Sequence, residues 1–121
     1  MKRSIPMLVL PFLLLGCASQ KTPATADVAV GRNAVDNATA AGAAELAPDE
    51  LSAARIKMQR ASSALAAKDY TAARELATQA AADARLAQSK ASTAKATAAA
   101  DALQEDIRVL REEVERANKP R

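Results

Sequence analysis

Cys17 is the one side chain in this sequence with an uncommon chemical capability. It is the only cysteine among 121 residues, and the chain has no histidine. A thiol can attack a substrate, bind a metal ion or accept an acyl group, but nucleophilic catalysis needs a base beside it. A metal site needs several suitable ligands. The sequence therefore predicts no enzyme, no metal site and no cofactor.

The acidic residues fit structural roles. Asp49 and Glu50 stand where the first turn of a helix favours negative charge, and Asp69 is placed to cap a helix. Asp83 and the pair at 112–113 fit solvated helix faces, the latter between arginines. None of these positions forms a catalytic constellation.

The N-terminus has the pattern of a secretory signal peptide. A basic start at Lys2 and Arg3 precedes residues 5–15, which hold nine large apolar side chains interrupted by Pro6 and Pro11. A membrane-spanning helix needs roughly 20 apolar residues, so this run is too short to span. The two prolines argue against a buried core helix. Residues 1–16 are predicted to be a cleaved signal peptide.

The segment Leu14-Leu15-Gly16-Cys17 resembles the lipobox of bacterial lipoproteins. The resemblance implies cleavage between Gly16 and Cys17, where a small residue suits the peptidase, and a covalent lipid on Cys17. It further implies the outer membrane, facing the periplasm, because the next residue is Ala18 and not aspartate. The alternative is a free cysteine that acts as a small hydrophobe.

Cleavage would change the charge and the aromatic content of the chain. The precursor has 17 basic and 14 acidic side chains, and the signal peptide contains two of the basic ones, Lys2 and Arg3. The mature chain is then close to neutral, with no dense basic stripe, so no nucleic-acid partner is expected. Phe12 also leaves, and Tyr70 remains as the only aromatic residue. A thick core is not expected, and thin packing of alanine-rich helices is.

Periodicity predicts three helices after a polar segment. Residues 17–27 include Pro23 and show no apolar period, and they are expected to be a lipidated N-terminus and a flexible tether. Residues 28–102 are expected to be an alanine-rich helical domain. The first helix is expected over 28–46, with Val35, Ala38 and Gly42 on one face. The second should begin at Pro48. Its apolar stripe is Leu51, Ala54, Met58, Ala61 and Leu65.

The third helix is expected over residues 70–118, about 73 Å at 1.5 Å per residue. Its first part carries an alanine at alternating spacings of four and three, from Ala73 to Ala98. Residues 103–121 form a heptad-like extension with a different stripe. Its members are Leu103, Ile107, Leu110, Val114 and Ala117. The first four of these residues are the candidate interaction seam, and its alternative is packing onto the protein's own helices.

The predicted fold is all-α, an antiparallel helical hairpin or three-helix arrangement with a long C-terminal helix, coiled-coil-like at its end. Around the second turn, Asp69-Tyr70 followed by Ala73 and Ala80 resembles the second half of a tetratricopeptide repeat. With one copy only, a solenoid is not expected. The residues expected to shape the hairpin elbows are Pro48, Asp69, Tyr70 and Ala73. Tyr70 is expected to be buried as a wedge between the second and third helices.

Two blocks resemble a family of bacterial envelope lipoproteins with a domain of unknown function. They are Ala47-Pro48-x-Glu50-Leu51 and Asp69-Tyr70-x-x-Ala73-Arg74, within a resemblance that covers residues 28–102. Members occur alone or ahead of an OmpA-like peptidoglycan-binding domain, and no such domain is expected in this chain. The resemblance implies an envelope location and a helical architecture, and it implies no activity.

The function expected from these features is structural. An outer-membrane-anchored periplasmic lipoprotein would act as a scaffold through helix-mediated contact with a protein partner or with itself. The alternative is a tether that resembles the major outer-membrane lipoprotein, which joins peptidoglycan through a C-terminal lysine. Here Lys119 is followed by Pro120 and Arg121. The terminal-lysine signature is therefore missing, and the tether, with peptidoglycan as its contact, remains the alternative.

Overall fold

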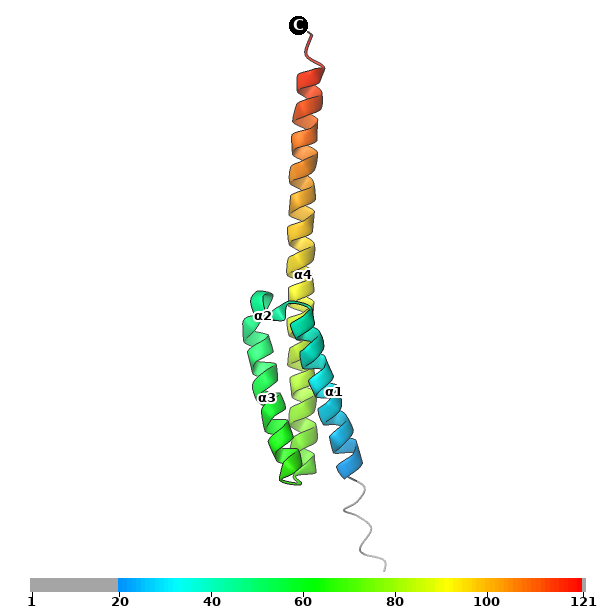
Figure 1. Ribbon diagram of the computed structural model, residues 1–121, viewed down its shortest axis with the longest axis vertical. Coiled ribbons are helices and arrows are strands. Elements are labelled where there is room, and N and C mark those ends of the chain that lie inside the picture. The colour runs from blue at the N-terminus through cyan, green and yellow to red at the C-terminus, as the bar shows by residue number, and fades with distance from the viewer. Residues whose placement is uncertain (1–19, 121) are drawn as a thin grey trace, which may run out of the picture.

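The computed structural model describes residues 20–120, and over that range it contains four α-helices and no strand. Helices α1 (Lys21–Ala40), α3 (Pro48–Ala66) and α4 (Tyr70–Ala117) are long, and α2 (Ala43–Leu46) is one turn between α1 and α3. The chain runs up α1, down α3 and up α4, so α1 and α4 are parallel (Figure 1). The predicted all-α fold with a long final helix is confirmed.

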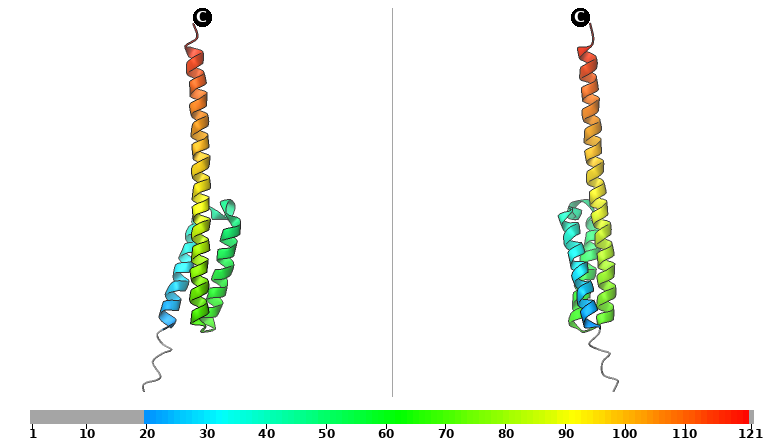
Figure 2. Two further views of the ribbon diagram at one scale, coloured as in Figure 1. Left: turned by 180° about the vertical axis from the view of Figure 1, so that it is seen from behind. Right: turned by 90° about the vertical axis from the view of Figure 1, so that its right-hand side faces the viewer.

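Helix α4 is the centre of the molecule. Both α1 and α3 pack along its N-terminal half and contact each other less extensively (Figure 2). The α4 side of this core consists of small side chains, which let the helix backbones approach closely. They are Ala73, Ala77, Ala80, Ala81, Ala84, Ala87 and Ala91. The largest fully buried side chain of the described residues is Leu51. The core is therefore thin, as the scarcity of aromatic residues predicts.

Helix α3 has a clear start and one apolar face. Pro48 occupies the first turn, where its missing N–H would have no helical partner, and Asp49 and Glu50 follow it. Four of the five residues of the predicted stripe are buried and the fifth, Leu65, is half-buried against the core. The start at Pro48 and the buried face are as predicted.

The turn between α3 and α4 is closed by backbone hydrogen bonds and a side-chain cap. The N–H of Asp69 donates to the carbonyl oxygen of Ala64 (2.9 Å), and that of Lys68 donates to Leu65 (3.1 Å). This pair of bonds is a Schellman motif, which places Lys68 in the left-handed region at φ 64°. Asp69 then caps α4, because its Oδ1 accepts from the N–H of Ala72 at 3.1 Å.

Helix α1 begins earlier than the sequence suggested. The predicted flexible tether over 17–27 is wrong from Lys21 onward, because α1 starts there. Pro23 misled the interpretation, since in the first turn of a helix proline removes no hydrogen bond. Ala24 and Val28 are buried and extend the apolar face toward the N-terminus. Residues 17–19 and the predicted signal peptide lie outside the described residues.

The predicted first helix over 28–46 is also interrupted. Gly42 adopts φ 85°, a left-handed conformation that ends α1 and separates it from α2. The N–H groups of Ala41 and Gly42 satisfy the last carbonyls of α1, at Asn37 (2.9 Å) and Thr39 (3.0 Å). The chain therefore reverses over residues 41–47 and not at Pro48 alone.

The bundle covers only part of α4. Burial of the alanine stripe ends at Ala91, with Ala94 half-buried and Ala98 exposed. At 1.5 Å per residue, the 48 residues of α4 extend about 72 Å, whereas the 20 residues of α1 extend about 30 Å. We call residues 95–117, beyond the bundle, the arm. It projects from the end of the bundle opposite to the start of α1 (Figure 1).

Candidate interaction surface on the arm of α4

The arm exposes large apolar side chains on an otherwise polar helix. Five of them have exposed fractions between 40% and 60%: Leu103, Ile107, Val109, Leu110 and Val114. Scattered apolar residues on a surface need no explanation, but a contiguous row does. The arm is therefore where the described residues offer the clearest apolar surface to another molecule.

Four of these five side chains share one face of the helix. Leu103, Ile107, Leu110 and Val114 follow spacings of four, three and four, and Ala117 continues the row. The first four are the predicted seam, and they and Ala117 are all exposed. The alternative considered from the sequence, that the seam packs on the protein's own helices, is wrong. Helices α1, α2 and α3 end before the arm begins (Figure 1).

The hollow beside the seam is shallow and largely apolar. Ile107, Leu110 and Val114 form its floor, and Arg111 and Glu115 border it. Long charged side chains at such a border can cover apolar surface with their aliphatic stems while their heads stay in water. The surface thus has the composition of a helix-packing face and not that of a small-molecule site.

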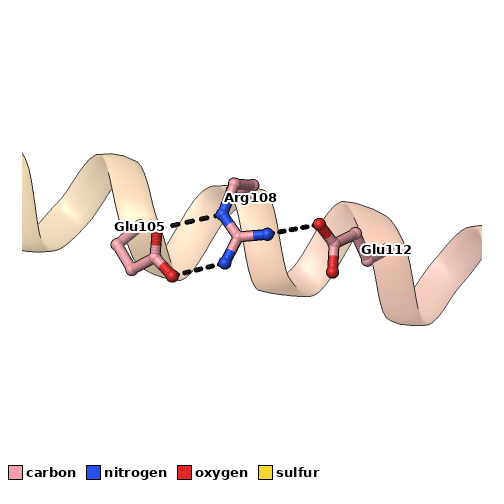
Figure 3. Close-up of polar contacts among 3 residues, drawn as sticks. All are labelled: Glu105, Arg108 and Glu112. Carbon is pink, nitrogen blue, oxygen red and sulfur yellow. Dashed lines mark hydrogen bonds and ion pairs between the residues drawn. The ribbon is translucent and has the colours of Figure 1, made fainter.

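A charge cluster occupies another face of the arm. Arg108 lies between Glu105 and Glu112 and contacts both carboxylates, with its Nε 2.9 Å from Oε2 of Glu105 (Figure 3). The Arg108 guanidinium lowers the pKa of Glu105, and Glu105 in turn raises the pKa of Arg108. Pairs at these spacings support an exposed helix. The cluster therefore helps to keep the arm helical without covering the seam.

Ion pairs between helices fix the bundle from which the arm projects. Glu50 in α3 pairs with Lys90 in α4, which lies next to the last buried alanine, Ala91. The hydrogen bond from Lys90 and that from the N–H of Glu50 itself hold the pKa of Glu50 below its ordinary value of 4.5. A charged hydrogen bond thereby joins α3 to α4 at the end of the bundle from which the arm projects.

Two further pairs connect α4 to its neighbours. Lys57 Nζ lies 2.6 Å from Oδ2 of Asp83, an oxygen that has no access to solvent. Arg74 Nε lies 2.8 Å from Oδ2 of Asp27 in α1, at the far end of the bundle. Asp83, which was expected on a solvated helix face, is therefore half-buried and is a structural partner of α3.

The residues predicted to shape the elbows do not form one site. Asp69, Tyr70 and Ala73 lie together at the α3–α4 turn, where Tyr70 is half-buried against the core and Ala73 is fully buried. Pro48 lies at the opposite end of α3. Gly16 and Cys17, the predicted cleavage and lipid sites, lie outside the described residues.

Sequence reasoning did not predict the contacts between helices, and two of those it missed involve α1. Gly31 lies where α1, α3 and α4 meet, and a Cβ there would come within 2.8 Å of Met58 Sδ and 3.0 Å of the Ala77 carbonyl oxygen. The Asp27–Arg74 pair was missed because Asp27 was assigned to the tether. Extending the stripe through Ala24 would have placed Asp27 on a helix.

Within residues 20–120, no helix has the length and apolarity required to cross a membrane.

Comparisons with known proteins identify a family. No curated protein and no solved structure matches the chain. The family described as "Domain of unknown function (DUF4398)" matches residues 26–103. This range covers the bundle except for the first residues of α1, and it includes the first part of the arm. The chain belongs to the DUF4398 family.

Proposed function

We propose that this protein is an outer-membrane lipoprotein, anchored through a lipid on Cys17, that acts as a structural scaffold in the periplasm by helix-mediated protein contact. The lipobox-like Leu14-Leu15-Gly16-Cys17 supports the anchor and the signal peptide. Ala18 supports the outer membrane. The scaffold role rests on the arm.

The observation that carries the scaffold role is the uncovered seam. A helix that extends about 33 Å beyond its bundle at 1.5 Å per residue gains no tertiary packing for that length. Nevertheless it carries apolar side chains at heptad spacing, and every residue of the seam is exposed. A partner that packs on the seam would explain both why the arm is helical without tertiary packing and why it carries exposed apolar side chains.

The direction of the arm fits an anchored protein. Helix α1 begins at Lys21, at the end of the bundle opposite to the arm (Figure 1). If Cys17 is held at a membrane, the arm points away from it. The length of α4 then carries the seam to roughly 50–70 Å from the anchored end. The same geometry would serve a tether to peptidoglycan, the second candidate.

Cell fractionation tests the anchor. Replacing Cys17 with Ser should remove the covalent lipid and release the protein from the outer-membrane fraction, because serine lacks the thiol that would carry the diacylglyceryl group. A Ser19→Ala variant, two positions away, should remain in that fraction. Persistence of labelled lipid and outer-membrane location in the Cys17→Ser variant would contradict the anchor.

Photocrosslinking in cells tests the scaffold role. A photoreactive residue at Leu110 should capture a protein, whereas the same residue at Glu112, on the face of the Arg108 cluster, should capture little. Capture of peptidoglycan from Leu110 would favour the tether instead. Equal labelling from both positions would contradict a specific seam.

A further inference from the structure

We infer that the occupant of the seam is the seam of a second copy of this chain, in a parallel, in-register, two-stranded coiled coil. This inference deepens the proposed function, on whose helix-mediated contact it rests, by naming the partner. It depends on the residues at the seam, on the charges beside it and on the side of α4 that the bundle occupies.

The residue types on the seam favour two parallel strands. In a heptad frame, Ile107 and Val114 occupy a positions, and Leu103 and Leu110 occupy d positions. β-branched residues at a with leucine at d favour a parallel dimer over higher oligomers. Every one of these side chains is exposed in the single chain, so each is free to act as a knob.

The flanking charges select the parallel orientation. Asp106 occupies a g position and Arg111 the following e position, which face each other across a parallel dimer. Two such opposite-charge pairs form by symmetry. In an antiparallel dimer with these apolar layers aligned, g positions face g positions, and Asp106 would lie near Glu113 of the other copy. Like charges opposite each other oppose that arrangement.

The seam continues into the bundle without a charged residue. In the same frame, the a and d positions over 82–117 hold only apolar or hydroxyl side chains, and they include Leu86, which is 49% exposed. However, Arg85 and Lys90 occupy a g position and the following e position. In a parallel dimer these two positive charges would face each other and repel. We therefore place the closest packing in the arm, over residues 96–117, about three heptads. A short seam of this kind predicts a weak dimer in solution.

The bundle leaves the seam accessible. In the frame of the seam, the buried alanines from Ala73 to Ala91 fall mainly at b and f positions, which lie away from the partner in a two-stranded coiled coil. Helices α1 and α3 pack on those alanines. Arg108 and its partners Glu105 and Glu112 also occupy b and f positions. Two copies can thus meet along α4 with both bundles and both charge clusters outside.

Disulfide trapping tests contact and register together. In the full-length chain carrying Cys17→Ser and purified in mild detergent, Leu110→Cys should give a disulfide-linked dimer under oxidation. Identical d positions of a parallel dimer lie close enough for this bond. Glu112→Cys, at an f position, is the matched control and should remain largely monomeric. No dimer from Leu110→Cys, or equal yields from both variants, would overturn the inference.

A second test does not depend on cysteine chemistry. Sedimentation over a concentration series should show that Ile107→Glu abolishes dimer formation, whereas Val109→Glu does not. The two residues are almost equally exposed, 41% and 40%, but only Ile107 lies on the seam. Asp106→Arg should weaken the dimer by on the order of tenfold, and adding Arg111→Asp should restore it. Absence of that restoration would contradict the parallel register.

The two proposals fail in distinguishable ways. If seam crosslinking in cells captures a different protein and the purified chain stays monomeric, the inference is wrong while the scaffold role survives. If the purified chain dimerises as described but fractionation shows no lipid anchor, the anchored function is wrong while the dimer stands.

Discussion

At the scale of single residues, Lys68 adopts a strained backbone conformation that lowers the stability of the fold. The Schellman turn between α3 and α4 forces it to φ 64°, a conformation that costs an L-residue with a Cβ roughly 1–2 kcal/mol. Glycine adopts it with no steric penalty, although it loses more freedom on folding. The position is exposed, so no packing depends on the lysine side chain.

Lys68→Gly should therefore raise the free energy of unfolding by about 1 kcal/mol. Urea denaturation followed by circular dichroism measures the change. Lys68→Ala is the matched control and should give no gain, because alanine keeps the Cβ that causes the strain. A glycine variant no more stable than the alanine variant would show that the turn is not strained.

The Glu50–Lys90 pair should make stability depend on pH. Because the pKa of Glu50 is lower in the folded protein than its ordinary value of 4.5, the unfolded chain binds its proton first as the pH falls. The contribution of the pair is thus fully present above about pH 4.5 and is lost as the pH falls through the lower, folded pKa. Glu50→Gln should lower stability at neutral pH and flatten this part of the acid-induced loss.

Unfolding measured from neutral pH to about pH 3 checks this expectation. Lys90→Gln should show a similarly flattened profile, because it removes the other half of the pair. If the Glu50→Gln curve runs parallel to that of the unchanged protein, the pair contributes nothing to the pH dependence.

At the scale of elements, α4 has two parts with different structural roles. Its first part carries every buried residue of the helix and holds α1 and α3. The arm has no tertiary contact from α1, α2 or α3 along its seam, and its own side-chain pairs, such as Arg108 with Glu112, support it. The boundary between the parts lies between Ala91, the last buried residue, and Lys95, where the arm begins.

Truncation should separate these roles. A chain ending after Leu103 should change the free energy of unfolding of the bundle by less than about 0.5 kcal/mol, as for surface changes in general. A chain ending after Ala84 is the control and should be much less stable, because it loses the buried Ala87 and Ala91. Melting curves at low protein concentration, where dimers dissociate, measure both. A large loss on ending at Leu103 would mean that the arm contributes to the bundle.

The sequence predicted best those elements that have explicit start signals. Pro48 is the first residue of α3 and Asp69 caps α4, and both helices begin as expected. Helix α1 was predicted poorly because its buried face consists of small residues such as Ala24 and Gly31, whose periodicity is faint. Pro23 and Gly42 were each given the wrong role, the first as a sign of disorder and the second as part of a helix.

The seam was predicted residue by residue, but its exposure was not. Spacing alone placed Leu103, Ile107, Leu110 and Val114 on one face. Whether that face would be covered depended on where α1 and α3 end relative to α4, which is a tertiary property. Tyr70 shows the same limit, since it was expected to be a buried wedge and is half-buried. Its replacement by alanine should therefore cost less than the 3–5 kcal/mol typical of a fully buried aromatic residue.

At the scale of the whole molecule, the bundle and the arm together make an elongated protein with distinct ends. One end carries the start of α1, near the proposed lipid site, and the other carries the seam (Figure 1). Attachment to a membrane would confine copies to one surface in the same orientation. Such confinement raises the effective concentration of one seam for another and favours parallel pairing. A dimer that is weak in solution can therefore be populated on a membrane.

The most direct test of the central claim is a cysteine-accessibility scan of the arm in intact envelopes. Single cysteines placed along residues 103–117 would be labelled with a water-soluble maleimide. A covered seam predicts protection at Leu103, Ile107, Leu110 and Val114, with Glu105, Val109 and Glu112 freely labelled. Protection should thus recur at alternating intervals of four and three. Equally rapid labelling at all positions would show that nothing covers the seam and would contradict its role as an interaction surface.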